Sequence, residues 1–315
     1  MSDLNPSDLA PARAEPILLN GVVIDDDFAE AFDMAATAVI VTADTPEWAM
    51  QAAISTTGFA TSVIACGCEA GIDRVVAPDD TPDGRPGVRI LLFGFNAEIC
   101  GQQIVTRVGQ CVLTCPGTAC FAGLDEGEAV KLGSALRYFG DGYQISKVID
   151  GKRYWRIPVM DGEFLVEHET RVVTGAVGGG NLILLARSRA AARLAAETAI
   201  AAMKAVPDVI MPFPGGIVRS GSKVGSKYKA LMASTNHFFC PTLKGAVEGS
   251  HLTPEVASVL EIVIDGLSFA AVQAAMRAGL HAAAGLGSAE GLVRIAAGNY
   301  GGQLGRHHFH LKDLV

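Results

Sequence analysis

The sequence predicts an α+β protein made of two ferredoxin-like (βαββαβ) lobes related by internal duplication. The order strand, helix, strand, strand, helix, strand occurs twice, from Ala38 and again from Asn181, and this order is typical of the split β-α-β fold. A length of 315 residues gives room for about two domains. The connection between the second and third strands is longer in the second copy (214–257) than in the first (67–87). Because loops carry binding groups more often than scaffolds do, the longer connection is where we expect function.

The elements of the first copy follow from the period of its apolar residues. Strands are expected at residues 38–43, 61–66, 87–94 and 111–115, and helices at 45–55 and 96–108. Pro82-Asp83-Gly84 indicates a turn before the third strand.

The second copy repeats the pattern. Strands are expected at residues 181–187, 208–213, 258–266 and 291–299, and helices at 188–206 and 268–284. A final strand around His307–His310 would place His308 and His310 on one face.

Turn signals divide the two copies. Phe139-Gly-Asp-Gly142 and Asp150-Gly-Lys152 flank short extended pieces, and the boundary is expected near Met160. The predicted units are an N-terminal extension (1–15), a first lobe (16–160) and a second lobe (161–315) with an enlarged substrate loop at 213–257. The extension has few apolar residues and includes prolines, which favours either a loose extension or a docking tail.

Composition narrows the functional class. Half of the residues are hydrophobic and 18% are charged, so some apolar surface is expected to close against other subunits. The net charge of −8 argues against nucleic-acid binding, which needs a basic surface. Neither a charge-free apolar window of membrane-spanning length nor a signal peptide is recognised, so no membrane contact and a cytoplasmic location are expected.

The seven cysteines and the C-terminal histidines do not predict a metal site. The spacing of Cys66, Cys68, Cys111, Cys115 and Cys120 does not match paired C-x-x-C knuckles. Three of them, Cys66, Cys111 and Cys115, fall in predicted strands, where a thiol packs as a small hydrophobic group. The histidines of 307–310 lack a convergent carboxylate, which favours a solvated or interface face.

A glycine-rich basic loop lies in the enlarged connection. Gly215, Gly216, Arg219, Lys223 and Lys227 belong to this loop, together with Ser222 and Ser226. Its sequence is close to the Walker A motif of phosphate-binding loops, but the Lys and Ser of the motif are transposed and no clear helix follows. Glycines let backbone N–H groups approach a ligand, and the cationic side chains suit an anionic one. The alternative is a flexible surface loop with solvated lysines.

Thr235 and Asn236 follow in the same connection. With Ser234, they offer hydroxyl and amide groups that can bind a polar heterocycle. Such residues also commonly cap their own turn, so both interpretations stay open.

Glu261 interrupts the apolar strand Val259–Ile264. A carboxylate in a central strand is costly when charged. When Gly94 is aligned with Gly266, the matching residue of the first copy is Arg89. One interpretation is a rim carboxylate paired with a basic residue. The other is a semi-buried acid whose pKa is raised by desolvation, so that it stays protonated near neutrality.

Sequence runs along almost the whole chain resemble the formylmethanofuran–tetrahydromethanopterin formyltransferases. The matching runs are Asn20-Gly-Val-Val-Ile-Asp, Phe28-Ala-Glu-Ala-Phe, Thr57-Gly-Phe, Glu69-Ala-Gly-Ile-Asp, Thr81-Pro-Asp-Gly-Arg-Pro-Gly-Val, Val108-Gly-Gln-Cys-Val, Phe139-Gly-Asp-Gly-Tyr-Gln, Pro212-Phe-Pro-Gly-Gly-Ile-Val, Ser222-Lys-Val-Gly-Ser-Lys, Ala233-Ser-Thr-Asn, Glu261-Ile-Val-Ile and Ala297-Gly-Asn-Tyr-Gly-Gly. Only residues 1–15 fall outside the resemblance.

The resemblance implies an N-formyltransferase that moves a formyl group between N5 of tetrahydromethanopterin and the amine of methanofuran. Both coenzymes would be substrates, with no tightly bound cofactor and no metal. It implies Glu261 as the catalytic glutamate, and Arg85 and Asn299, which lie in matching runs, as further substrate-binding residues. It also implies a homo-oligomer, dimer or tetramer, and in the bacterial branch a complex with hydrolase subunits.

A different functional class is the alternative. Duplicated ferredoxin-like lobes also serve as non-catalytic, small-molecule-binding regulatory proteins. Such a protein would not need a protonatable glutamate in a central strand.

Overall fold

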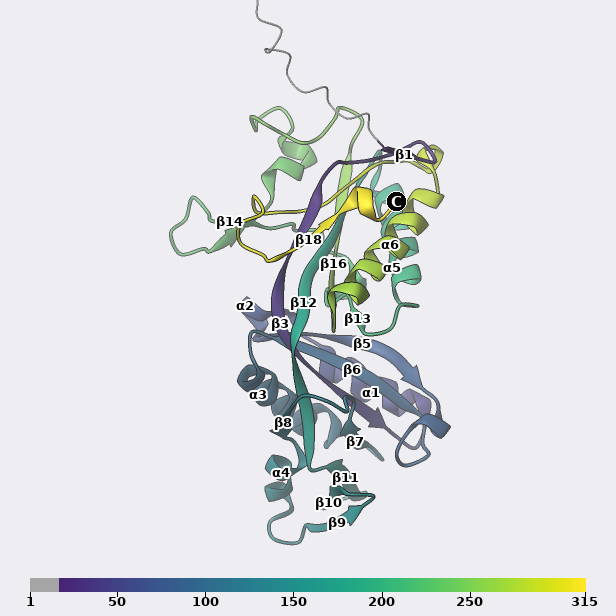
Figure 1. Cartoon of the computed structure of the whole chain (residues 1–315), viewed down its shortest axis with the longest axis vertical. Coiled ribbons are helices and arrows are strands. Elements are labelled where there is room, and N and C mark those ends of the chain that lie inside the picture. The colour runs from purple at the N-terminus through teal and green to yellow at the C-terminus, as the bar shows by residue number, and fades with distance from the viewer. Residues whose placement is uncertain (1–16) are drawn as a thin grey trace, which may run out of the picture.

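The computed structural model describes residues 17–315. Two lobes are stacked along the long axis of the molecule, and two long strands run through both of them (Figure 1). These strands are β3 (Phe28–Thr42) and β12 (Glu169–Ala186). The predicted N-terminal extension, residues 1–15, lies outside the described residues. The fold is of the mixed α+β class, in agreement with the prediction.

The first lobe is built on the second half of β3. The other elements of its sheet and its two helices are α1 (Pro46–Thr57), β5 (Cys68–Val76), β6 (Gly87–Gly94), α3 (Ala97–Arg107) and β7 (Ala119–Ala122). The strands lie in the order β7-β3-β6-β5, with every neighbour antiparallel. Apolar residues of α1 and α3, such as Ala52 and Ile104, pack on Val39 and Ile90 to form the core of this lobe.

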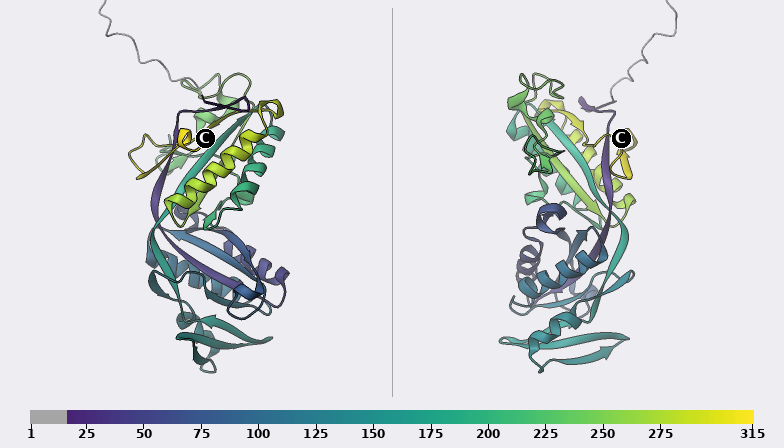
Figure 2. Two further views of the ribbon diagram at one scale, coloured as in Figure 1. Left: turned by 45° about the vertical axis from the view of Figure 1, so that its right-hand side comes forward. Right: turned by 90° about the vertical axis from the view of Figure 1, so that its left-hand side faces the viewer.

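The second lobe is built on the second half of β12. Its further elements are α5 (Arg189–Met203), β13 (Val209–Ile210), β16 (Ser258–Gly266), α6 (Phe269–Gly285) and β17 (Leu292–Ala296). The order is β17-β12-β16-β13, again with every neighbour antiparallel. The two helices lie side by side on one face (Figure 2), where Ala196, Met203 and Leu280 pack on Leu184 and Ile262.

The long strands join the lobes into one sheet. β12 pairs with β3 through residues 172–178 and then continues into the second lobe. The register shifts between Thr174 and Ala176 and between Gly178 and Gly180. Gly175 and Gly179 have φ angles of +86° and +97°. This conformation favours glycine and lets the strand bend at the lobe junction.

The N-terminal strands of the chain belong to the second lobe and not to the first. β1 (Ile17–Leu19) and β2 (Val22–Ile24) join the second lobe, where β2 pairs parallel with β17. The first residues of β3 pair with β18 (His307–His310). Val22, Ile24, Ala29 and Ala31 are thereby buried in the core of the second lobe. The predicted domain boundary near Met160 stays a prediction.

A smaller β layer closes the base of the first lobe (Figure 1). It is formed by β8 (Glu128–Lys131), α4 (Gly133–Leu136), β9 (Ile145–Ile149), β10 (Lys152–Val159) and β11 (Gly162–Glu167). β10 lies between β9 and β11 and is antiparallel to both. The predicted turns lie where expected: Asp141 and Asp150 have positive φ and are each followed by glycine.

The strand predicted at 61–66 is wrong. β4 (Thr61–Ser62) is followed by the short helix α2 (Val63–Cys66), which ends at Gly67 with φ +81°. The long strand is β5, which begins at Cys68 in the segment expected to be a loop. A short apolar run does not distinguish helix from strand, and β5 was missed because Glu69, Asp73 and Arg74 obscure its apolar pattern.

The strand predicted at 111–115 is also wrong. The chain continues from α3 into a π-helical turn, Val108–Val112, and the strand follows later as β7. Of the three cysteines expected in strands, Cys66 therefore ends α2, Cys111 lies in the π-helical turn and Cys115 follows it. All seven cysteines are free.

The enlarged connection between β13 and β16 has little regular structure. It holds a small hairpin, β14 (Lys223–Val224) with β15 (Ala233–Ser234), and short 3₁₀ turns at 214–216, 237–239 and 241–243. The hairpin projects from the body of the second lobe (Figure 1). Phe239 and Leu252 of this connection pack on Ile183 and Val259, on the sheet face opposite the two helices.

Candidate active site

Glu261 lies at the centre of β16, the predicted central strand. Its neighbour on β12 is Ile183, and on the other side its backbone pairs with Val218. Residues 262 and 264 point into the helix-covered core, so alternation directs Glu261 to the opposite face, where Val259 also lies. Burial raises the pKa of Glu261 to about 7. At neutral pH a large fraction of this side chain therefore carries its proton.

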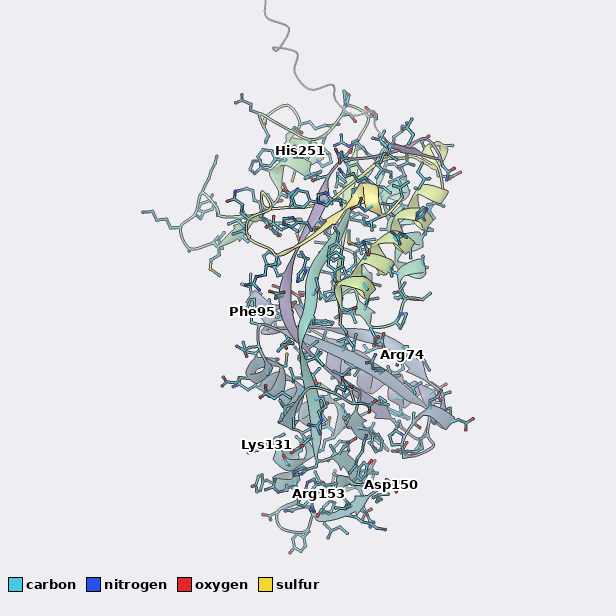
Figure 3. The ribbon with its side chains drawn as sticks, in the orientation of Figure 1. Arg74, Phe95, Lys131, Asp150, Arg153 and His251 are labelled. Carbon is cyan, nitrogen blue, oxygen red and sulfur yellow. The ribbon has the colours of Figure 1, made fainter. Side chains whose placement is uncertain are left out.

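The matching residue Arg89 has a different environment. Its Nη1 donates to Asp73 Oδ2 at 2.7 Å and to Asp208 Oδ1 at 2.5 Å. Asp208 belongs to the second lobe, and its backbone N–H donates to Asp73 Oδ1 at 2.9 Å. Matching positions in the two lobes thus have different roles. Glu261 of the second lobe is a protonatable acid, whereas Arg89 of the first lobe forms ion pairs at the lobe junction. Arg74, which is labelled in Figure 3, lies at this same junction. Its side chain also contacts Asp73.

Two glycines bring the enlarged connection against β16. Gly215 and Gly216 form a tight turn with φ angles of +64° and +84°. A Cβ on Gly216 would lie 2.8 Å from Ile200, whereas Gly215 faces open space. After this turn, Val218 and Glu261 exchange backbone hydrogen bonds of 2.8 and 2.9 Å. The glycine turn therefore sets the connection beside the acid.

A cleft of about 360 Å³ opens at this turn, between the lobes. Gly215, Gly216 and Pro212 line it from the second lobe, and Phe59 and Gly71 line it from the first. The Phe59 side chain is largely exposed. An exposed aromatic side chain beside a cleft lined by glycine backbone suits a flat polar ligand.

The basic residues of the connection face solvent. Arg219 and Lys227 are exposed and Lys223, in β14, is partly exposed. Within residues 17–315, the salt bridges pair other basic groups and leave these three for a ligand. Ser226 accepts a hydrogen bond from the Tyr228 N–H and shapes the tip of the hairpin.

Thr235 and Asn236 support the base of the hairpin. The Thr235 hydroxyl donates to the Ser220 carbonyl at 3.1 Å. Asn236 precedes a 3₁₀ turn and packs against Gly221. These contacts match the turn-supporting interpretation and leave the Asn236 amide partly exposed.

Tyr300, in the loop after β17, was not singled out from the sequence. Burial raises the pKa of the Tyr300 hydroxyl, the Ser222 side chain opposes the rise, and the charges of Glu261 and Glu30 add to it. Ser222 comes from the enlarged connection and Tyr300 from the loop after β17. An aromatic residue in a glycine-rich loop directly after a strand was the signal available in the sequence.

Asn299 and Arg85 are placed differently from the group around Glu261. The Asn299 side chain donates to Asp27 Oδ1 at 2.8 Å and accepts from the Gly301 N–H, which stabilises its own loop. Arg85 lies in the first lobe, where it pairs with Asp83 and Asp44 at 2.9 Å each. It lines a separate cavity of about 480 Å³ with Trp48. Within one chain, the structure does not bring Arg85 to Glu261.

The C-terminal histidines form an aromatic cluster rather than a metal site. His308 and His310 share one face, as expected, and their rings lie 4.8 and 5.2 Å from the Phe28 ring. His307 contacts Asp33 at 2.8 Å. Across residues 17–315, no group of three or more His, Cys, Asp or Glu side chains is placed to hold a metal ion.

The helices of the described part of the chain are too short or too polar to cross a membrane.

The fold matches that of formyltransferases. The family model "Formylmethanofuran-tetrahydromethanopterin formyltransferase" matches residues 17–159, and "FTR, proximal lobe" matches residues 162–314. One similar structure is the formyltransferase/hydrolase complex from Methylorubrum extorquens in complex with methylofuran, with a TM-score of 0.93 and 62% identity over 95% of this chain and 99% of that one. The formyltransferase of Methanosarcina barkeri has a TM-score of 0.90 and 44% identity over 95% and 100%.

Sequence relatives agree. A component of the formyltransferase/hydrolase complex of Methylorubrum extorquens is 63% identical over 302 residues, 94% of this chain and 97% of the relative. The formylmethanofuran–tetrahydromethanopterin formyltransferase of Methanocaldococcus jannaschii is 46% identical over 94% and 99%. The chain is thus an enzyme of the N-formyltransferase class. It belongs to the formylmethanofuran–tetrahydromethanopterin formyltransferase family. The regulatory alternative is not supported.

Proposed function

We propose that the chain transfers a formyl group between N5 of tetrahydromethanopterin and the amine of methanofuran. The observation that carries the chemistry is Glu261, a carboxylic acid in an apolar strand whose pKa is raised to about 7 by burial. Its backbone pairs with Val218, which follows the glycine turn at Gly215 and Gly216, and that turn lines the interlobe cleft. The names of the relatives supply the two substrates.

Formyl transfer between two nitrogens passes through a tetrahedral intermediate. The acceptor nitrogen adds to the formyl carbon, and the bond from that carbon to the donor nitrogen then breaks. The protonated Glu261 donates to the developing oxyanion or to the departing nitrogen. When it protonates the departing nitrogen, it regains a proton from the acceptor nitrogen, so the enzyme ends in its starting form. This route needs neither a covalent acyl-enzyme nor a tightly bound cofactor.

The substrates are assigned to the surfaces around Glu261. Arg219, Lys223 and Lys227 would contact an anionic tail through charge-assisted hydrogen bonds. The glycine turn and the cleft would hold a ring system. Residues proposed for binding are Arg85, Gly215, Gly216, Ser222, Ser226, Thr235, Asn236 and Asn299. Because Arg85 does not approach Glu261 within one chain, its role here requires a second copy or a distal part of a substrate.

We infer that the enzyme works in the cytoplasm as a homo-oligomer and with hydrolase subunits. One relative is named as a component of a formyltransferase/hydrolase complex. Large apolar side chains are exposed on the surface of this chain, including Phe59, Tyr143 and Met160. Such side chains favour contacts between subunits.

We also infer that each lobe is ferredoxin-like and that the lobes arose by duplication. The strand order β7-β3-β6-β5 of the first lobe has the same antiparallel pattern as β17-β12-β16-β13 of the second. In both lobes, two helices cover one face. β6 and β16 both end at a glycine, Gly94 and Gly266, and Arg89 and Glu261 lie five residues before it.

The function is tested by incubating the purified chain with 5-formyl-tetrahydromethanopterin and methanofuran. Formylmethanofuran is the expected product, and Glu261→Gln is the matched control with impaired transfer. If no transfer occurs even with hydrolase-type partner subunits present, the proposal is wrong.

A further inference from the structure

A buried carboxylate holds the loop that carries Tyr300. Glu30, on β3, is only 1% exposed. Its Oε2 accepts from the N–H groups of Tyr300 at 2.6 Å and Gly302 at 2.8 Å. Its Oε1 accepts from those of Leu304 and Gly305, both at 2.6 Å. Four backbone donors thus converge on one side chain about 270 residues away in the chain.

The charge of Glu30 is stabilised by this arrangement. Burial works to raise the pKa of Glu30, but the N–H groups of Gly305, Tyr300, Gly302 and Leu304 outweigh it and hold the pKa below its usual value. Hydrogen bonds to an ionised acceptor are stronger than those between neutral groups. The four donors therefore fix an ionised side chain and, in return, fix the path of the loop.

The loop sequence is built for this contact. Gly301 and Gly302 have φ angles of +88° and +73°, which let successive N–H groups turn towards one point. At Gly305, a Cβ would lie 2.4 Å from the Ala31 carbonyl oxygen and 2.9 Å from Glu30 Cγ. The backbone approaches β3 so closely there that only glycine fits.

The loop starts on the sheet face that carries Glu261. Ala296, the last residue of β17, pairs with Ile183 of β12, and Ile183 pairs with Glu261. A Cβ on Gly298 would lie 3.6 Å from the Ile183 side chain, and the Tyr300 ring lies 6.0 Å from that of Phe32 on β3. The loop that Glu30 holds therefore continues from the row of residues that contains the acid of the proposed reaction.

We propose that Glu30 is a positioning residue that holds the loop 298–305, and Tyr300 within it, over the sheet face that carries Glu261. This inference rests on the proposed function for its kinetic consequence. With the loop in place, Tyr300 and the enlarged connection shield Glu261 from water and preserve its acid form. Glu30 touches neither substrate nor reacting atoms. The titratable groups that this arrangement involves are Glu30, Tyr300 and Glu261.

The primary test is Glu30→Gln, studied in the full-length chain. An amide has one acceptor oxygen, so its NH₂ group would face two N–H donors and leave them unsatisfied. We expect faster hydrogen exchange at the amides of Tyr300, Gly302, Leu304 and Gly305. We also expect kcat to fall by roughly 10- to 100-fold. The alkaline limb of the kcat profile, where Glu261 loses its proton, should move to lower pH because water reaches Glu261.

Three further variants separate positioning from stability. Glu30→Asp keeps the charge and should restore part of kcat and of the pH profile. Gly305→Ala leaves the carboxylate in place but forces the loop away from it, so it should reproduce the effects of Glu30→Gln. Tyr300→Phe removes the hydroxyl without disturbing the Glu30 contacts, and should shift the pH limb without lowering the melting temperature.

The matched control is Asp33→Asn. Asp33 lies on the same strand and pairs with Arg306 and His307 at the surface, outside the loop. The Asp33→Asn substitution removes one negative charge, as Glu30→Gln does. It should leave kcat and the alkaline limb of the kcat profile unchanged.

The outcomes are distinguishable. If the wild type transfers formyl groups while Glu30→Gln and Gly305→Ala lose only thermal stability and keep the wild-type kcat and pH profile, the positioning role is overturned. If Glu30→Gln does not fold, Gly305→Ala and Tyr300→Phe carry the same kinetic test. If the wild type itself does not transfer a formyl group, the proposed function fails. Loss of amide protection in Glu30→Gln would then still support the anchoring of the loop, and unchanged protection would overturn it.

Discussion

The carboxyl groups of Glu69 and Asp265 are neighbours where the two lobes meet, and Asp265 Oδ2 is buried without a hydrogen-bond donor among residues 17–315. Glu69 is the second residue of β5 in the first lobe, and Asp265 follows the apolar run of β16 in the second. Asp265 Oδ1 accepts from the Gly179 N–H at 3.1 Å, and Glu69 Oε1 accepts from the Val63 N–H at 3.2 Å. Asp265 is fully buried. Because two neighbouring buried carboxyl groups are costly to ionise together, we expect one of them to keep its proton.

The first prediction concerns this pair. Burial raises the pKa of Asp265, and the neighbouring Glu69 raises it further. Burial also raises the pKa of Glu69. A raised folded-state pKa contributes stability that is fully present below the unfolded value of about 4 and is lost as pH rises through the folded value. The melting temperature of the wild type should therefore fall on going from mildly acidic to alkaline pH.

Asp265→Asn removes the proton requirement but keeps a hydrogen-bond donor and the side-chain volume. Its melting temperature should depend less on pH, and the difference from wild type should favour the variant most at alkaline pH. Thermal unfolding across a pH series measures both. An equal pH dependence in the two proteins would contradict a proton held at this junction.

The second prediction concerns Glu261. Glu261→Gln keeps the neutral shape and a donor but cannot deliver a proton. We expect near-wild-type stability, retained coenzyme binding and a kcat lower by about 10² to 10⁴. Because burial raises the pKa of Glu261 to about 7, the wild-type kcat should decline as pH rises through that value. Steady-state kinetics test both points, and a Gln variant with most of its kcat would exclude proton transfer by Glu261.

The third prediction concerns the basic connection. Neutralising Arg219, Lys223 and Lys227 together should raise KM more than it lowers kcat, and the effect should shrink at high salt. Each exposed pair with a substrate is expected to contribute about 0.2–1 kcal/mol. The control is the same charge change at Lys131, Lys147 and Arg153 at the base of the first lobe, where Lys131 and Arg153 are marked in Figure 3. Equal KM values for both triple variants would return the connection to a solvated surface loop.

The fourth prediction concerns the ion pairs between the lobes. Arg89→Met leaves the buried Asp73 carboxylate without its main partner, and should cost about 3–5 kcal/mol of unfolding free energy. Arg74→Met is the control, because Arg74 contacts the same Asp73 but its side chain is half exposed. It should cost about 1 kcal/mol or less. Urea unfolding compares the two, and similar losses would mean that burial does not govern this network.

The fifth prediction concerns assembly. Light scattering at micromolar concentration should show at least a dimer, because of the large apolar side chains on the surface of one chain. Activity that falls on dilution and returns on concentration would place the site at a subunit contact. A fully active monomer would show that one chain completes the site.

Much of the second lobe was predictable because its elements have strong, uninterrupted patterns. β16 occupies the predicted residues 258–266, and α6 differs from the prediction by one residue at each end. Glu261 was also identifiable, since a charged residue in a continuous apolar strand is costly and therefore informative.

The first lobe was less predictable. β5 carries Glu69, Asp73 and Arg74, whose partners lie in distant segments, so its sequence resembles that of a loop. The role of Glu30 could not be predicted for a similar reason. Its four donors are about 270 residues away, and they are backbone groups that leave no signal in residue type beyond the glycines that make room for them. The periodicity and composition of a sequence do not predict which side chain will contact backbone groups that are far away in the chain.

The continuity of β3 and β12 limits how this enzyme can move. Two lobes that are joined by a flexible linker can rotate apart by a hinge motion. In this chain, two hydrogen-bonded strands continue through the junction between the lobes. Opening the cleft at Gly215 must therefore flex a sheet, and the compliant points of that sheet are the bulges at Gly175 and Gly179. Small changes in the width of the cleft therefore cost little free energy, because the sheet can bend without losing hydrogen bonds. Wide separation of the lobes would break the hydrogen bonds between β3 and β12.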